Sequence, residues 1–216
     1  MIISDKYNFI IFAIPHTGSS STQRILEPYG WCSFSEENHL TPDYVRAHVK
    51  IRGYPNWDKY YKVTVVRNPW DRFVANMHAI NNHNKVEPKF SKFNLPNPTY
   101  KNLAEYAQSG FYDGMLQQEY MYTFDNQNDP VIDFFIKFET LEDDIVKLCQ
   151  KLNIPIPKQF RHDNNWNITP DSKRFARKHY SEYYTEQWVI DSVAEKEKFV
   201  IEKMGYKFGE DGNRWR

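Results

Sequence analysis

Three short apolar runs stand out along the chain, at residues 9–14, 61–66 and 131–138. Each run is rich in β-branched and aromatic residues, and runs of this length and composition predict buried β-strands. Pro15 directly follows the first run. Because proline cannot donate to a sheet ladder, we expect that strand to end there.

Helix signals separate the predicted strands. Thr41 and Asn68 each precede a proline, which is a typical helix start. Thr140, with Asp143 three residues later, predicts a capping box. The predicted helices cover residues 23–26, 42–51, 69–81, 99–108, 115–123, 141–153 and 185–204. Strands that alternate with helices in this way predict an α/β fold with a mainly parallel sheet flanked by helices.

The length and the charge balance limit the classes of protein. At 216 residues the chain predicts a single domain, 1–216, in which residues 82–130 form a mostly helical and loop insertion between strands. Lys plus Arg and Asp plus Glu both number 28, which does not indicate a general binder of nucleic acid or of membrane surfaces. No apolar run approaches the length of a membrane span. We therefore expect neither nucleic acid nor a membrane as a partner, and the oligomeric state stays open.

The cysteines and the N-terminus point to a reducing compartment. Cys32 and Cys149 are isolated and lack metal-ligand spacing, so they predict free thiols. The first residues lack the basic and apolar regions of a signal peptide, and we expect a cytoplasmic protein. No cluster of metal-ligating residues is visible in the sequence, so we expect no metal in the chemistry.

A small polar loop follows the first predicted strand and leads into a helix. Gly18 permits a tight turn or a close backbone approach. A strand, a small polar loop and a helix N-terminus together collect an anion, because N–H groups and the helix dipole favour negative charge and hydroxyls add donors. The loop comprises Pro15, His16, Thr17, Gly18, Ser19, Ser20 and Ser21, and the hydroxyls that follow Gly18 would add donors to the anion site.

This loop is not a Walker A motif, which requires two glycines and a lysine in the pattern G-x-x-x-x-G-K-[ST]. The loop has one glycine, no lysine and His16 ahead of the glycine. An ordinary nucleoside triphosphatase is therefore not indicated. From this stretch alone, a serine-rich turn without a ligand remains the alternative.

Arg67 directly follows the second predicted strand and precedes the helix predicted from Pro69. In open α/β sheets, ligands bind at the carboxyl ends of the strands. This position makes Arg67 a candidate ligand-binding residue, and a surface ion pair is the alternative.

Four blocks in order now carry a resemblance. They read IPHTGSSS at 14–21, VVRNPWDR at 65–72, FIKFETLEDD at 135–144, and a tail that runs from Tyr180 to Phe208. Together they resemble the sulfotransferases that use 3′-phosphoadenosine 5′-phosphosulfate (PAPS). The branch they resemble most contains the heparan-sulfate-type carbohydrate sulfotransferases and their bacterial relatives. The resemblance spans nearly the whole chain and implies a P-loop-like three-layer fold.

The resemblance implies a role for each block. The loop 15–21 would hold the 5′-phosphosulfate of the donor, and Arg67 would bind its 3′-phosphate, a task that suits a guanidinium fork. Lys173 and Arg174 would close over the nucleotide, with a solvated charged face as the alternative. Two positions depart from the family pattern: His16 replaces the loop lysine, and Ala75 replaces a serine that would contact the 3′-phosphate.

Two histidines are the predicted catalytic residues. In the heparan-sulfate branch a histidine lies between the two nucleotide loops and ahead of a helix, and His39 matches that position. Its implied role is the base that takes the proton of the acceptor hydroxyl. His16 would steady the leaving phosphate, for which an imidazole must be protonated. His48 lies within the following predicted helix and is the next candidate base.

These observations predict a sulfotransferase that moves a sulfuryl group from PAPS, without a metal, to a hydroxyl of a small-molecule or glycan acceptor. Residues 27–38 and 82–98 are expected to shape the acceptor pocket. Two alternatives stay open. One is a catalytically impaired binder of nucleotides or polyanions with the same fold, suggested by His16 and Ala75. The other is a P-loop kinase, against which the missing Walker lysine counts.

Overall fold

The computed structural model describes residues 1–32, 39–51, 57–86, 99–114, 122–124, 130–160 and 178–210. The chain forms two compact units, which are described separately. The first unit comprises Met1–Arg67 and Gln118–Asp163. The second comprises Asn68–Gln117 and Asn164–Arg216.

The described residues of the first unit contain a five-stranded sheet in the order β3-β1-β2-β4-β5. Strands β2, β4 and β5 run parallel to one another, while β1 is antiparallel to both β2 and β3. The strands are β1 (Ile2–Ser4), β2 (Phe9–Phe12), β3 (Trp31–Cys32), β4 (Tyr61–Val66) and β5 (Phe134–Lys137). The predicted α/β fold with a mainly parallel sheet flanked by helices is confirmed, and β1 and β3 are additions to it.

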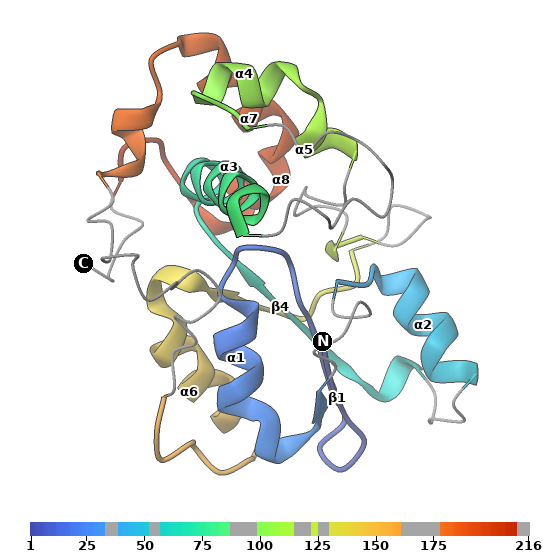
Figure 1. Cartoon of the computed structure of the whole chain (residues 1–216). Helices are drawn as coiled ribbons and strands as arrows, with labels where there is room; N and C mark the ends of the chain where they lie inside the picture. The colour runs from blue at the N-terminus through green and yellow to red at the C-terminus, as the bar shows by residue number, and fades with distance from the viewer. Residues whose placement is uncertain are drawn as a thin grey trace. The chain divides into compact units, whose positions relative to one another are not determined.

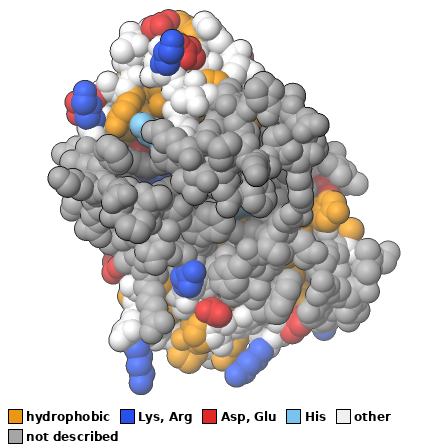
Figure 2. Space-filling model, viewed as in Figure 1, with side chains coloured by type: hydrophobic (Ala, Val, Ile, Leu, Met, Phe, Trp, Pro, Cys, Tyr) orange, Lys and Arg blue, Asp and Glu red, His pale blue; other side chains and the backbone are white. Residues whose placement is uncertain are grey.

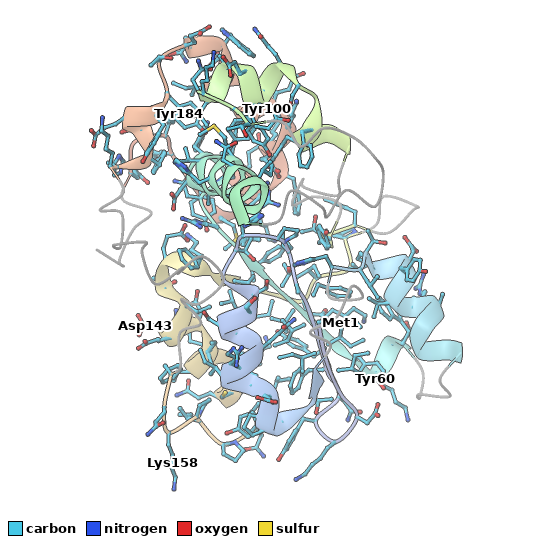
Figure 3. All side chains as sticks on the ribbon, in the orientation of Figure 1. Met1, Tyr60, Tyr100, Asp143, Lys158 and Tyr184 are labelled. Atoms are coloured by element: carbon cyan, nitrogen blue, oxygen red, sulfur yellow. The ribbon has the colours of Figure 1, made fainter. Side chains whose placement is uncertain are left out.

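Helices cover both faces of this sheet (Figure 1). Side chains along a strand alternate between faces. Phe9 and Ile11 therefore pack with α1 (Ser19–Leu26) and α6 (Leu141–Leu152). Ile10 and Phe12 pack on the opposite face, in a cluster that also contains Met1, Val45 and Tyr60, of which Met1 and Tyr60 are labelled in Figure 3. Burial on both faces explains why the strands read as continuous apolar runs.

The second face is covered by α2 (Pro42–Ile51) and by a 3₁₀ turn, η3 (Trp57–Lys59). A further turn, η1 (Glu27–Tyr29), follows α1. The helix predicted at 42–51 is confirmed with those bounds. The helix predicted from residue 23 begins four residues earlier, at Ser19.

The capping box predicted for α6 is wrong. Thr140 is the N-cap residue but accepts no capping hydrogen bond, and Asp143 is exposed on α6 (Figure 3). Instead, the Thr140 hydroxyl donates to Oδ2 of Asp144 at 2.9 Å. The same carboxylate oxygen accepts from the backbone N–H of Lys137 at 3.0 Å. Asp144 thus links the start of α6 to the end of β5. A capping box would bond only residues within the start of α6.

Cys149 lies in the core of the first unit with no exposed surface. Burial disfavours the thiolate and raises the pKa of Cys149 from its ordinary value of 9.0 to about 11. Since the thiolate is the nucleophile, a shift of two pKa units lowers the reactive fraction roughly 100-fold near pH 8. The structure therefore makes Cys149 an inert thiol.

In a Cys32→Ser variant, we expect a thiol reagent at pH 8 to label Cys149 at least about 100-fold more slowly in the folded chain than in urea. The free energy of unfolding should also fall as pH rises from about 9 to about 11, because the thiol releases its proton at a lower pH in the unfolded chain than in the folded chain. Equal labelling rates in the folded and unfolded chain would contradict the buried position.

The second unit is helical in its described residues. It contains α3 (Pro69–Val86), α4 (Leu103–Gln108), α5 (Phe111–Gly114), η7 (Tyr180–Tyr183), α7 (Gln187–Lys196) and α8 (Lys198–Met204). Its core is unusually aromatic and joins α3 to α4 and α7; Tyr100 and Tyr184 of this cluster are labelled in Figure 3. The Tyr184 hydroxyl donates to the Trp70 carbonyl at 2.9 Å, and burial raises the Tyr184 pKa well above its usual value.

The prediction of one helix over 185–204 is wrong in one respect: two helices, α7 and α8, lie there and are separated at Glu197. Glu197 and Arg72 are both fully buried, and Nη1 of Arg72 lies 3.4 Å from Oε1 of Glu197. The Arg72 guanidinium also donates to the Tyr112 hydroxyl at 2.8 Å, and that hydroxyl donates to Glu197. This buried network holds the chain where α7 ends and α8 begins.

Other boundaries differ from prediction by a few residues. Helix α3 continues to Val86, beyond the predicted end at 81, so part of the predicted loop 82–98 is helical. Helix α4 begins later than predicted, because the Asn102 side chain caps it by accepting from the Glu105 N–H at 2.9 Å. Residues 87–98 and 115–121 lie outside the described residues, and with them most of the helix predicted at 115–123.

The described surface carries both signs of charge. Lys and Arg side chains and Asp and Glu side chains are interspersed over the described part of the face that Figure 2 shows. In the described part of the chain, no helix is both long enough and apolar enough to cross a membrane.

Candidate functional site

The loop between β2 and α1 has the strand–loop–helix arrangement predicted from the sequence. His16 and Gly18 both adopt left-handed backbone conformations, with φ of 63° and 82°. Thr17, between them, is fully buried, and its hydroxyl donates to the Ile14 carbonyl at 2.9 Å. The loop is therefore a tight, internally bonded turn, and the Thr17 hydroxyl is used inside it.

The turn delivers the chain into the N-terminus of α1. Gly18 is the N-cap residue and provides no side-chain cap. Its carbonyl accepts from the Thr22 N–H at 3.1 Å and from the Thr22 hydroxyl at 3.2 Å. Helix geometry leaves the N–H groups of the first turn, which begins with Ser19 and Ser20, without intrahelical acceptors. The helix dipole adds partial positive charge there, so this end of α1 favours an anion.

Arg67 lies beside the same loop. It follows β4, which pairs with β2 in parallel, with Thr64 opposite Phe12. Nη1 of Arg67 donates to the His16 carbonyl at 3.2 Å, and only 7% of the Arg67 surface is exposed. The predicted position at the carboxyl ends of the parallel strands is thus confirmed, and the guanidinium also holds the loop.

Phe138, which the sequence analysis did not single out, belongs to the same site. It opens the 3₁₀ turn η5 (Phe138–Thr140) directly after β5. Its ring centroid lies 4.5 Å from the guanidinium carbon of Arg67. A Cβ added to Gly18 would approach the Phe138 ring to 2.6 Å, so the ring occupies space that any larger residue at position 18 would need. The third block of the resemblance, 135–144, contains this residue, but only the fold shows what it contacts.

His39 adjoins the first residue after β2. Its Nδ1 lies 2.6 Å from the Ala13 carbonyl oxygen. Because a carbonyl can only accept, Nδ1 carries the hydrogen, and in the neutral ring the lone pair is then on Nε2. His39 is half-buried. A half-buried imidazole with its basic nitrogen on Nε2 is suited to take a proton.

Some of the remaining predicted site residues lie in the loop and others do not. His16 is half-buried within the loop, and Pro15, Ser19 and Ser21 are buried there. Ala75 lies on α3 in the second unit and is 5% exposed. Lys173 and Arg174 lie outside the described residues, as does the side chain of His48, whose backbone belongs to α2. Within the described residues, no group of three His, Cys, Asp or Glu side chains is arranged to hold a metal ion.

A family model described as "Sulfotransferase family" matches residues 1–197. The chain belongs to the sulfotransferase family. Searches of curated proteins and of solved structures returned no match. Membership makes this protein a transferase of the sulfuryl group. In this sulfotransferase, Arg67 contacts the His16 carbonyl and His39 contacts the Ala13 carbonyl, so both side chains lie against the segment that follows β2.

Proposed function

We propose that this sulfotransferase takes its sulfuryl group from PAPS and transfers it to a hydroxyl, with a carbohydrate as the acceptor. The observation that carries the donor assignment is the N-terminus of α1, with a glycine cap in the left-handed conformation and Arg67 braced beside it. A nucleotide with a 5′-phosphosulfate and a 3′-phosphate needs such a pair of anion sites. The carbohydrate acceptor rests on the resemblance to the heparan-sulfate-type branch.

The residues present fit this donor. Backbone N–H groups at the start of α1 and the hydroxyls of Ser19 to Ser21 would bind the 5′-phosphosulfate, and Arg67 would bind the 3′-phosphate. The Phe138 ring fills the space that a Cβ of residue 18 would need, so this turn requires glycine. When bound, PAPS supplies an activated sulfuryl group. His16, half-buried in the loop, would add positive charge when protonated.

His39 would act on the acceptor side. The hydrogen bond from Nδ1 to the Ala13 carbonyl fixes the ring and leaves Nε2 as the proton acceptor. That nitrogen would take the proton of the acceptor hydroxyl, which is general base catalysis. Thr17 is given no role as a base, because its hydroxyl donates to the Ile14 carbonyl within the loop.

A thermal-shift comparison separates this proposal from its alternatives. We expect 3′,5′-adenosine bisphosphate to stabilise the folded chain by about 2.7 kcal/mol at 100 times its Kd. ATP at the same concentration should stabilise the folded chain much less. Stabilisation by ATP with Mg²⁺ instead would favour a kinase. Binding of the bisphosphate without transfer of label from PAPS to any of a panel of glycans would favour the binder without catalysis.

Replacing Arg67 with alanine should weaken 3′,5′-adenosine bisphosphate by about 10- to 100-fold, because a charge-assisted hydrogen bond contributes roughly 1.5–3 kcal/mol. The binding of 5′-AMP should weaken less. Arg67 also braces the His16 carbonyl, and loss of that brace affects both ligands equally. The ratio of the two losses, measured by titration calorimetry, therefore isolates the 3′-phosphate. Equal losses would show that Arg67 only braces the loop.

A further inference from the structure

Three strand ends bring three residues together at the proposed donor site. Arg67 follows β4, Phe138 follows β5, and Gly18 ends the loop that follows β2. The three are far apart in the sequence and belong to the same unit of the chain. The parallel register of β2, β4 and β5 places their carboxyl ends side by side.

The ring of Phe138 lies between the other two. The Arg67 guanidinium carbon lies over this ring, 4.5 Å from the ring centroid. Towards Gly18, two ring atoms lie 2.6 and 2.9 Å from the point where a Cβ would be. The ring can occupy this place only because residue 18 has no side chain. A cation over an aromatic face is attracted by the ring quadrupole, more strongly where water is excluded.

Two contacts restrain the Arg67 guanidinium. The attraction to the Phe138 ring acts on the cation as a whole, so it does not compete with oxygen acceptors for the N–H donors. One in-plane N–H of Arg67 is directed at the His16 carbonyl. Phe138 and the loop thus hold the guanidinium at the same time, which restricts the directions in which its N–H donors point.

We propose that Phe138 is a positioning residue for the donor site: it holds the Arg67 guanidinium in place so that its donors meet the nucleotide phosphate. This inference rests on the proposed function, since it assumes that Arg67 contacts the donor. It assigns Phe138 a role through Arg67 and no contact with the reacting atoms.

Two substitutions and a matched control test it. Phe138→Leu keeps apolar bulk but removes the ring face, while Phe138→Tyr keeps the ring. Phe134→Leu is the control, because Phe134 is also half-buried and begins β5, the strand that leads into Phe138, but packs against the core cluster of α1 and α6. Titration calorimetry with 3′,5′-adenosine bisphosphate and thermal unfolding are measured for each variant.

We expect Phe138→Leu to weaken the bisphosphate about 5- to 10-fold, a loss within the range of a partly desolvated cation–π contact. Phe138→Tyr and Phe134→Leu should stay within about twofold of the unsubstituted chain. In an Arg67→Ala background, Phe138→Leu should add less than about twofold, because its effect passes through Arg67.

Contrary outcomes are distinguishable. If the unsubstituted chain fails to bind the bisphosphate, the proposed function fails and this inference fails with it. If the unsubstituted chain binds but Phe138→Leu matches Phe134→Leu in affinity, only the role of Phe138 is overturned. If Phe138→Leu causes the same loss of affinity in the Arg67→Ala background, the role of Phe138 is overturned as well, because Phe138 would then act independently of Arg67.

Discussion

Replacing Glu197 with glutamine should lower the free energy of unfolding by about 3–5 kcal/mol, the usual effect of removing one partner of a buried ion pair. Glu197 and Arg72 have no exposed side-chain surface, and Tyr112 bonds to both. Glutamine keeps the size of the side chain but leaves the buried guanidinium with one negative charge fewer. Urea denaturation, with a lowered midpoint at unchanged slope, measures the effect.

The exposed pair of Lys198 and Glu202 provides the control. The two residues are one helical turn apart on α8, and their charged atoms are separated by 3.8 Å. Their side chains are 73% and 66% exposed. Glu202→Gln should change the free energy of unfolding by less than about 1 kcal/mol, as exposed pairs usually do. A double variant, Arg72→Met with Glu197→Leu, should recover much of the stability lost in Glu197→Gln. Similar losses for Glu197→Gln and Glu202→Gln would contradict the role given to the buried network.

The same network shows why the C-terminal helix was predicted incorrectly. The apolar pattern from Thr185 to Met204 is continuous, and nothing nearby in the sequence interrupts it. At the break, Glu197 pairs with Arg72, which is 125 residues away in the chain. Periodicity records which face of a helix is apolar, whereas a break imposed by a distant partner leaves no local pattern.

Strands were predictable in proportion to their length and burial. The six residues of β4 carry strong β-branched character and were predicted with the observed bounds. The three-residue β1 and two-residue β3 are too short to show a period, so they were missed. Both owe their structure to pairing with a neighbouring strand rather than to their own residues.

The candidate site divides in the same way. The loop after β2 and the position of Arg67 could be predicted, because each depends on residues adjacent to a strand end. The contact of Phe138 with Arg67 could not, because it joins residues that follow different strands and are far apart in the sequence. The glycine at position 18 was recognised as permissive, but the ring that requires it to lack a side chain was visible only in the fold.

The hydrogen bond between His39 and the Ala13 carbonyl makes two roles for His39 separable. As a base, His39 needs Nε2. To hold the backbone at Ala13 in place, which we call its brace role, it needs only the donor at Nδ1. Asparagine places an N–H₂ group close to the position of Nδ1 and has no counterpart of Nε2. His39→Asn therefore removes the base while it keeps the brace, and His39→Ala removes both.

We expect both His39→Ala and His39→Asn to lower kcat by about 10²- to 10⁴-fold, the usual contribution of a general base, with sulfuryl transfer from labelled PAPS as the assay. Affinity for 3′,5′-adenosine bisphosphate should change little in His39→Asn, since the contact to Ala13 is kept. If His39→Asn retains kcat while His39→Ala loses it, His39 braces the loop and another group takes the proton. His48, in α2, is then the residue to replace next, because it was the second histidine that the sequence placed between the two nucleotide loops.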